Sequence, residues 1–253
     1  MIVCKSPAEL EKMRAANQLV AQVLEELAAL VAPGVTTADL DAAAEARVRA
    51  AGAEPAFKGY RGYPATLCAS VNEQVVHGIP NRTALASGDI VSLDMGVKLN
   101  GYYGDSAVTV PVGTVDENVR KLLRVTREAL DKGIAQVKVG GRISDIGHAI
   151  QAHVEANGFS VVREFVGHGI GASLHEEPQI ANYGEPGRGP RLAEGMTLAI
   201  EPMVNMGKAA VRVLADGWTA VTRDGSLSAH FEHTVAVTRD GPLVLTLRPV
   251  AAL

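Results

Sequence analysis

The sequence has little cysteine, few aromatic residues and no long hydrophobic run. Only Cys4 and Cys68 are present among 253 residues, which leaves no disulfide framework and no CxxC metal motif. No stretch approaches the roughly 18 apolar residues of a membrane span. Residues 1–14 lack the apolar run of a secretory signal. The sequence therefore predicts a cytoplasmic protein with no membrane partner.

The chain also lacks a strong excess of charge of either sign. Lys and Arg number 24 and Asp and Glu number 28, which gives a net charge of -4 with His neutral. This balance gives no electrostatic reason to expect nucleic acid as the main partner. Hydrophobic residues make up 47% and charged residues 21% of the sequence, as in ordinary globular proteins.

Two parts of the sequence share one pattern of helices, glycines and strands. Apolar spacing predicts helices over 7–31 and from Thr37 to before Gly52, then strands over 71–110. Helices over 116–137 and 144–157 follow, again with strands after them. The pattern predicts a repeat over about 6–112 and 113–248, in which two α-α-β halves join about a pseudo-twofold axis with helices outside.

The two parts correspond at a constant spacing. The pairs that are each 106 residues apart are Gly34 and Gly140, Asp39 and Asp145, Leu40 and Ile146, Val48 and Val154, and Gly52 and Gly158. The alternative is that two helix-Gly-helix segments fall into partial register by chance, and the constant spacing disfavours it.

Four carboxylates and one imidazole form a candidate two-metal site. They are Asp94, Asp105, His168, Glu201 and Glu232. Three of the carboxylates lie in apolar, strand-like runs, where a lone buried charge costs on the order of several kcal/mol. No Lys or Arg adjoins Asp94, Glu201 or Glu232, so a local ion pair does not explain them, although a distant one is left open. Two divalent ions balance four carboxylates better than one ion does.

Taken singly, these residues have ordinary structural explanations. Asp94 shares a small, polar strand face with Ser92, but an edge-strand aspartate in solvent is an alternative. Asp105 has the surroundings of a turn aspartate. His168 lies between two glycines, which we expect to form a loop whose backbone approaches a ligand. Together, the oxygen-rich set suits Mn, Fe(II), Co or Zn, and two such ions that share a water predict metal-assisted hydrolysis.

The motifs around these residues resemble those of type I methionine aminopeptidases. They are GYRGYPATLCASVNEQVVHGIP, LDMGV, GYYGDSA, GHGIGASLHEEP, AIEPM, DGWT and TRDGSLSAHFEHT, and they cover nearly the whole chain. The resemblance implies a single catalytic domain over 1–253 with the α+β pita-bread fold, a central antiparallel sheet and outer helices. It also implies two divalent metal ions. Asp94 would chelate the first, Asp105 and Glu232 would bridge both, and His168 and Glu201 would complete the second.

The resemblance also assigns substrate contacts and catalytic roles. His175 would steady the developing oxyanion, and His77 would contact the substrate backbone or help to move a proton. Glu201 would accept a proton from the metal-bound water, and the substrate amino group would bind a metal. The methionine side chain would enter a pocket lined by Tyr60, Tyr63, Cys68 and Trp218, with Phe57 and Leu174 at its edges. Ordinary core packing is the alternative for these pocket residues.

Three positions depart from the family pattern. A longer polar residue is common at Ala172, and an aromatic residue or Met is common at Leu174, which puts the pocket wall in doubt but not the metal. His230 lies where Gln is more usual. We hypothesise that this extra imidazole on the ligand face alters metal affinity or pH dependence.

The expected function is removal of the initiator methionine from nascent proteins whose second residue is small. Nascent polypeptide N-termini would be the partners, near the ribosome, although no basic segment marks a docking surface, and we expect a monomer. One alternative is a proline-specific aminopeptidase or dipeptidase of the same fold, which usually carries a large N-terminal domain. Another is a non-catalytic pita-bread binding protein, which the presence of all five ligands and both histidines disfavours.

Overall fold

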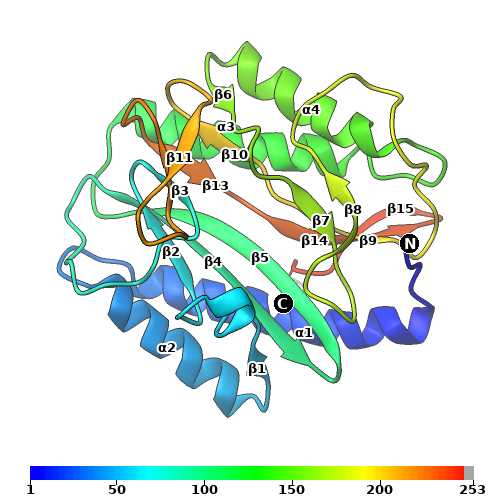
Figure 1. The fold of residues 1–253 in the computed structure, drawn as a ribbon, viewed down its shortest axis with the longest axis horizontal. Helices are drawn as coiled ribbons and strands as arrows, with labels where there is room; N and C mark the ends of the chain where they lie inside the picture. Colours follow the sequence, from blue (N-terminus) through cyan, green and yellow to red (C-terminus); the bar gives the residue numbers. More distant parts are fainter. Residues whose placement is uncertain (248–253) are drawn as a thin grey trace, which may run out of the picture.

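The computed structural model describes residues 1–247 as an α+β fold (Figure 1). The predicted second repeat ends at residue 248 and the predicted domain ends at residue 253. Residues 248–253 lie outside the described residues. The helices are α1 (Pro7–Leu30), α2 (Thr37–Ala50), α3 (Glu117–Ile134) and α4 (Ile143–Ala156), with the 3-10 turn η1 (Tyr60–Gly62). No helix within residues 1–247 has both the length and the hydrophobicity to cross a bilayer.

The strands fall into two groups along the chain. Before α3 they are β1 (Glu54–Pro55), β2 (Cys68–Val71), β3 (Gln74–Val76), β4 (Ile90–Leu99) and β5 (Tyr102–Pro111). After α4 they are β6 (Ser160–Val161), β7 (Gly167–Gly169), β8 (Glu176–Ile180), β9 (Thr197–Ile200), β10 (Met203–Asn205), β11 (Val211–Val213), β12 (Ala220–Thr222), β13 (Ser228–His230), β14 (His233–Thr238) and β15 (Gly241–Val244).

These strands pair antiparallel in four sheets over residues 1–247. One sheet has the order β1-β4-β2, with β5 paired to β4. A five-stranded sheet has the order β15-β14-β9-β7-β8. The orders of the two smaller sheets are β13-β10-β6 and β11-β12-β3, so the second of them combines a strand from before α3 with two from after α4.

The second helix of each half begins and ends with the same local signals. Helices α2 and α4 each contain 14 residues, and their first residues are 106 positions apart. Gly34 and Gly140 precede them with φ of 94° and 86°, and Gly52 and Gly158 follow with φ of 72° and 84°. These left-handed positions end a helix at little cost for glycine. The predicted correspondence of the two helical pairs is therefore present.

The first helix of the second half is shorter than predicted. The sequence predicts a helix over 116–137, whereas α3 ends at Ile134. Gln136 N and Val137 N donate to the carbonyls of Gly133 and Ile134, three residues back. Such bonds tighten the last turn and end the α-helical pattern before Val137.

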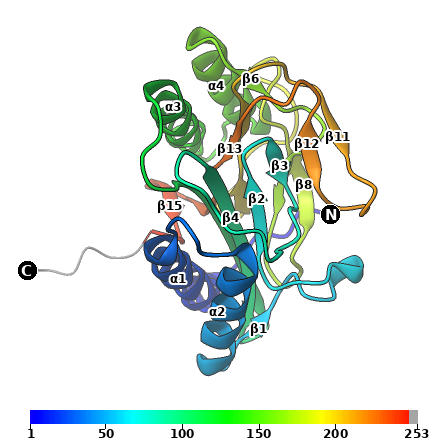
Figure 2. The ribbon, with the colours of Figure 1, turned by 90° about the vertical axis from the view of Figure 1, so that its left-hand side faces the viewer.

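A hydrophobic core cluster lies beneath the helices of each half, and a smaller cluster, which includes Met13 and Ile170, joins the two halves. Figures 1 and 2 show α1 and α2 beside the long β4–β5 hairpin, and α3 and α4 on the other part of the molecule. Val91, Leu93, Met95 and Val97 lie in one core cluster with residues of α1 and α2, as the alternation along β4 predicts. The opposite face of β4 carries Asp94 toward the centre of the molecule.

The two halves meet where β5 passes the segment before β14. Glu232 N donates to Ala107 O at 2.9 Å, and these two residues form an isolated antiparallel bridge. Ser106 Oγ donates to Glu232 O at 2.6 Å, and Thr234 Oγ1 donates to Asp105 O at 2.8 Å. The backbones of Asp105 and Glu232 are therefore held together by bonds from residues of both halves.

Candidate active site

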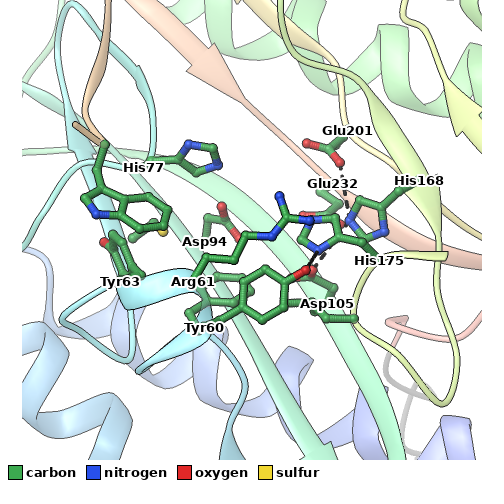
Figure 3. A pocket seen from close by; sticks show the side chains of 14 residues that line it. Tyr60, Arg61, Tyr63, His77, Asp94, Asp105, His168, His175, Glu201 and Glu232 are labelled. Atoms are coloured by element: carbon green, nitrogen blue, oxygen red, sulfur yellow. Dashed lines mark hydrogen bonds and ion pairs between the residues drawn. The ribbon is translucent and has the colours of Figure 1, made fainter. Parts of the chain in front are cut away.

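The five predicted metal ligands come from both halves and line one cavity (Figure 3). Asp94 lies on β4, Asp105 on β5 and His168 on β7, while Glu201 directly follows β9 and Glu232 directly precedes β14. His168 Nε2 is 3.9 Å from Asp105 Oδ2 and 3.7 Å from Glu201 Oε1. One ligand atom each from Asp105, His168 and Glu232 lie within 4.8 Å of one another.

The glycines beside His168 have a different role from the one predicted. The sequence predicts a glycine-rich loop that approaches a ligand, but Gly167–Gly169 form strand β7 between β8 and β9. A Cβ on Gly167 would overlap Ala199 O, and a Cβ on Gly169 would overlap Glu177 O. The loop prediction was wrong because these glycines instead allow the backbones of β8 and β9 to pack closely on both sides of His168.

The buried carboxylates have strongly perturbed acidity. Burial raises the pKa of Asp94 to about 7. Burial, followed by the charge of Asp94, also raises the pKa of Asp105 and of Glu201. The pKa of Glu232 is raised by burial and then by Asp105 and Glu201. Crowded acidic groups of this kind keep their protons unless a cation lies among them.

Two of these oxygens fit a metal in a further way. Within residues 1–247, neither Asp105 Oδ1 nor Glu232 Oε1 has a hydrogen-bond partner, although both atoms are buried. Buried acceptors without partners are costly. They belong to the two residues that the sequence analysis expects to bridge the metals. Carboxylate oxygens with one imidazole are suitable ligands for divalent ions, so the residues present fit a metal centre.

His168 is prepared to bind a metal as a neutral imidazole. Burial, with a smaller effect of His175, lowers the pKa of His168 to about 3. Its Nδ1 lies 2.9 Å from Gly169 O. With the proton on Nδ1, this nitrogen donates to the carbonyl and leaves the lone pair of Nε2 directed at the carboxylates.

The two predicted substrate histidines lie at the same cavity. His175 Nδ1 is 2.9 Å from Tyr60 Oη, and the two rings stack with centroids 5.3 Å apart. His77 packs edge-on against Trp218, with centroids 6.3 Å apart. Burial lowers the pKa of His77 to about 4, and burial followed by the charge of Arg61 lowers the pKa of His175. Both imidazoles are therefore neutral near pH 7.

All six predicted pocket residues also line this cavity, whose volume is about 160 Å³. They are Phe57, Tyr60, Tyr63, Cys68, Leu174 and Trp218. The hydroxyl of Tyr63 contacts Leu67 O at 3.0 Å and Gly78 O at 2.9 Å, which fixes the ring. Burial raises the pKa of the Cys68 thiol well above its usual value, so this side chain stays uncharged. The pocket wall is thus aromatic and sulfur-containing, which suits a thioether.

The three departures from the family pattern have different surroundings. Ala172 is exposed and does not belong to the cavity lining described for residues 1–247, whereas Leu174 is buried and does. His230 is 1% exposed, and its Nε2 lies 3.8 Å from Glu201 Oε2. Neither ring nitrogen of His230 has a hydrogen-bond partner within the described residues. The extra imidazole is therefore directed at a predicted ligand.

Within residues 1–247, the one further residue of the cavity lining is Arg61, which was not predicted from the sequence. Its guanidinium lies 5.4 Å from the centroid of the Tyr60 ring, and Figure 3 shows the side chain extending over Tyr60 toward His175. The backbone of Arg61 has φ of 50° and lies between Gly59 and Gly62, with φ of 85° and 89°. The motif GYRGYP contained a signal, since an Arg between two turn glycines is held close to the neighbouring tyrosines.

Comparisons with known proteins agree on one family. Residues 11–239 match metallopeptidase family M24. The chain is 55% identical over 246 residues to methionine aminopeptidase 1 of Bacillus subtilis, a match that covers 97% of this chain and 99% of that protein. It is similar to the crystal structure of methionine aminopeptidase from Thermotoga maritima, with a TM-score of 0.96, 51% identity and coverage of 98% and 100%.

One solved structure of lower sequence identity is named a prolidase and not a methionine aminopeptidase. The prolidase from Pyrococcus furiosus superposes with a TM-score of 0.80, but it is 23% identical. The match covers 98% of this chain and 66% of the prolidase. This likeness shows a shared fold alone.

Proposed function

The chain belongs to metallopeptidase family M24, and on this basis we propose that it removes the N-terminal methionine from nascent proteins whose second residue is small. The observation that carries the proposal is that all thirteen residues predicted to bind metal or substrate line one cavity. Relatives 50% to 55% identical over nearly the full chain are named methionine aminopeptidases. The proline-peptidase alternative has only the likeness of fold in its favour.

We infer that the cavity binds two divalent ions, with Mn, Fe(II), Co and Zn as the candidates. Asp94, Asp105, His168, Glu201 and Glu232 would hold them, and the buried oxygens of Asp105 and Glu232 that have no hydrogen-bond partner within residues 1–247 support the binding of a cation there. When bound, such ions supply Lewis-acid activation of water and of the peptide carbonyl. The ligand types do not select one metal, because all four tolerate carboxylate and imidazole.

The chain's own groups bind and orient the substrate. The methionine side chain packs against the rings of Tyr63 and Trp218, which lie edge-on with centroids 5.1 Å apart and exclude water from it. With the proton of the neutral His175 imidazole on Nε2, Nδ1 accepts a hydrogen bond from the Tyr60 hydroxyl and Nε2 would donate to the developing oxyanion. Glu201, which is ionised when a cation lies among the carboxylates, would accept a proton from the attacking water. His77 contacts the substrate backbone or moves a proton.

The proposed substrates are the N-termini of nascent polypeptides. Their chemistry implies that the enzyme works in the cytoplasm near the ribosome, and we infer that it does so as a monomer. Because the initiator methionine is exposed only at a free N-terminus, the pocket needs to recognise one side chain and one amino group.

Methionine release by metal-stripped protein tests the proposal. The protein is titrated with Mn, Fe(II), Co or Zn and assayed on Met-Ala-Ser, Leu-Ala-Ser and Ala-Pro, while calorimetry gives the number of ions bound. We expect metal-dependent release from Met-Ala-Ser alone and binding of two ions. Asp94→Asn should abolish both the release and one binding event. The matched control is Asp116→Asn, at an exposed helix cap without a side-chain hydrogen bond.

The outcomes separate the alternatives. Cleavage of Ala-Pro would indicate a proline peptidase. Absence of turnover with every metal would indicate a binding protein of the same fold. Binding of one ion with full activity would contradict the two-metal inference but leave the methionine specificity in place.

A further inference from the structure

A buried ion pair links the N-terminal segment to the segment that carries His175. Lys5 precedes α1, and its side chain is 3% exposed, while that of Glu176 is 14% exposed. Lys5 Nζ donates to Glu176 Oε2 and to Val3 O, the latter at 3.1 Å. The backbone N of Lys5 donates to Gly195 O at 2.6 Å. Both the side chain and the backbone of Lys5 are therefore held in place.

Two glycines make room for Lys5. A Cβ on Gly171 would overlap Lys5 Cε and would lie 2.6 Å from Glu176 Oε1. A Cβ on Gly195 would lie 2.5 Å from Lys5 O, and Gly195 has φ of 85°. Since any side chain at either position would displace Lys5, the last glycine of the GHGIG motif packs against this ion pair.

Glu176 takes part in hydrogen bonds within the segment 171–176. Its Oε1 accepts a hydrogen bond from Ser173 N at 3.1 Å, and Gly171 N donates to Ser173 O at 3.0 Å. Tyr103 N donates to Gly171 O at 2.8 Å, which attaches the start of the segment to β5. His175 lies between Ser173, which is bonded to the Glu176 carboxylate, and the Glu176 backbone, which begins β8 opposite Gly169.

The contacts of the His175 ring are with Tyr60, which bonds to its Nδ1 at 2.9 Å, and with His168. The residue is exposed, and its ring lies against Tyr60 and 4.2 Å from the ring of His168. A buried ion pair pays a large desolvation cost, and an uncharged pair of similar size is often equally stable. The Lys5–Glu176 pair is therefore poorly explained by stability alone, whereas it does fix the segment beside the cavity.

We propose that Lys5 is a positioning residue, which acts through Glu176 to hold residues 171–176 so that the imidazole of His175 faces the cavity. This inference rests on the proposed function, because methionine release is one of its readouts. It assigns to the N-terminal segment a role in the reaction without any contact between Lys5 and the substrate.

The double variant Lys5→Met with Glu176→Gln tests the proposal. It leaves no unpaired buried charge, and the Gln oxygen retains an acceptor for Ser173 N, so the free energy of unfolding should stay near that of the wild type. We expect kcat on Met-Ala-Ser to fall roughly tenfold with KM changed less, because small displacements of a catalytic group cost rate. Hydrogen exchange over 171–176 should become faster. The matched control is Lys132→Met, at an exposed position of α3.

The same double variant in a His175→Ala background separates positioning from general damage. If the pair acts through His175, the double variant should lower kcat no further once that imidazole is absent. An equal loss of kcat in both backgrounds would overturn the proposal, as would unchanged exchange over 171–176. A wild-type protein that releases no methionine with any metal would instead contradict the proposed function, and the exchange measurement would still report on the segment.

Discussion

At the scale of single residues, Arg61 is the charged neighbour of His175 at the cavity. Its positive charge lowers the pKa of His175, in addition to burial, because a nearby cation disfavours the imidazolium. His175 is proposed to act in its neutral form. Arg61→Gln should therefore raise the pKa of His175, so that protonation, and with it the loss of activity, begins at a higher pH.

The measurement for this residue is kcat/KM as a function of pH. We expect Arg61→Gln to lose more activity near pH 6 than near pH 8, with its acid limb displaced upward from that of the wild type. Arg188→Gln is the control, since Arg188 is exposed and pairs with Glu185 away from the cavity. Superimposable acid limbs for Arg61→Gln and the wild type would show that the charge does not act on the reaction.

Most of the candidate site could be predicted from the types of residues present. A set of acidic residues in apolar runs needs a cation, whatever the fold, so Asp94 and Glu201 could be identified without a structure. Arg61 was missed: the glycines of GYRGYP indicate a turn beside the tyrosines, but they do not show that its left-handed backbone carries the Arg61 side chain to the cavity. For His168 the residue was predicted but its setting was not, since glycines mark both loops and closely packed strands.

At the scale of elements, β7 holds His168 between β8 and β9, whose backbones lie close to Gly167 and Gly169 because these residues have no side chains. Gly169→Ala would place a Cβ against Glu177 O and displace the strand. We expect metal affinity to fall about 10- to 100-fold, as when other groups that orient a ligand are changed. Calorimetric titration of the metal-stripped variant measures this.

The control for Gly169→Ala is an alanine substitution at a glycine with a left-handed backbone, where the added Cβ would meet no neighbouring atom. Gly158 has φ of 84° and no atom within 4 Å of an added Cβ. Gly158→Ala should destabilise the protein by about 1 kcal/mol through its left-handed backbone and leave metal affinity unchanged. Equal metal affinities in Gly169→Ala and Gly158→Ala would contradict the role assigned to β7.

Helices were predicted from the sequence more closely than strands. The limits of α2 and α4 follow from local signals, namely the glycines that precede and follow each helix, and these lie in the sequence itself. The strands after α4 are two to six residues long, and their limits depend on partners far away along the chain. Such pairing, including the bridge between Ala107 and Glu232, comes from the assembled fold and could not be located beforehand.

At the scale of the whole molecule, the buried acidic groups make stability depend on pH. Folding raises the pKa of Asp94, Asp105, Glu201 and Glu232. Unfolded carboxylates ionise near pH 4, so above that pH the folded chain without metal retains protons that the unfolded chain has lost. By linkage, its free energy of unfolding falls as pH rises toward the raised pKa values.

Buried histidines have the opposite effect, but over a lower range of pH. Folding lowers the pKa of His168 and His230 to about 3 and that of His77 to about 4. The unfolded chain therefore binds more protons at these sites below about pH 6.5, which makes stability rise with pH there. From about pH 7.5, one unit above the unfolded pKa, the histidines are neutral in both states. The carboxylates alone then set the slope.

We therefore expect the Tm of metal-stripped protein to fall between about pH 7.5 and pH 8.5, and a saturating divalent ion to raise Tm more at pH 8.5 than at pH 7.5. The ion binds the ionised carboxylates of the folded state. Its stabilisation is therefore largest at the higher pH, where the metal-free folded chain loses most stability by retaining protons.

Asp94→Asn should flatten the slope of Tm against pH in the metal-free protein, because this carboxyl has a pKa of about 7 and its charge raises the pKa of its neighbours. Thermal unfolding at several pH values measures both effects, with Asp116→Asn expected to keep the wild-type slope. A Tm of stripped wild-type protein that stays level or rises over this range would mean that the four carboxylates do not retain their protons in the folded chain.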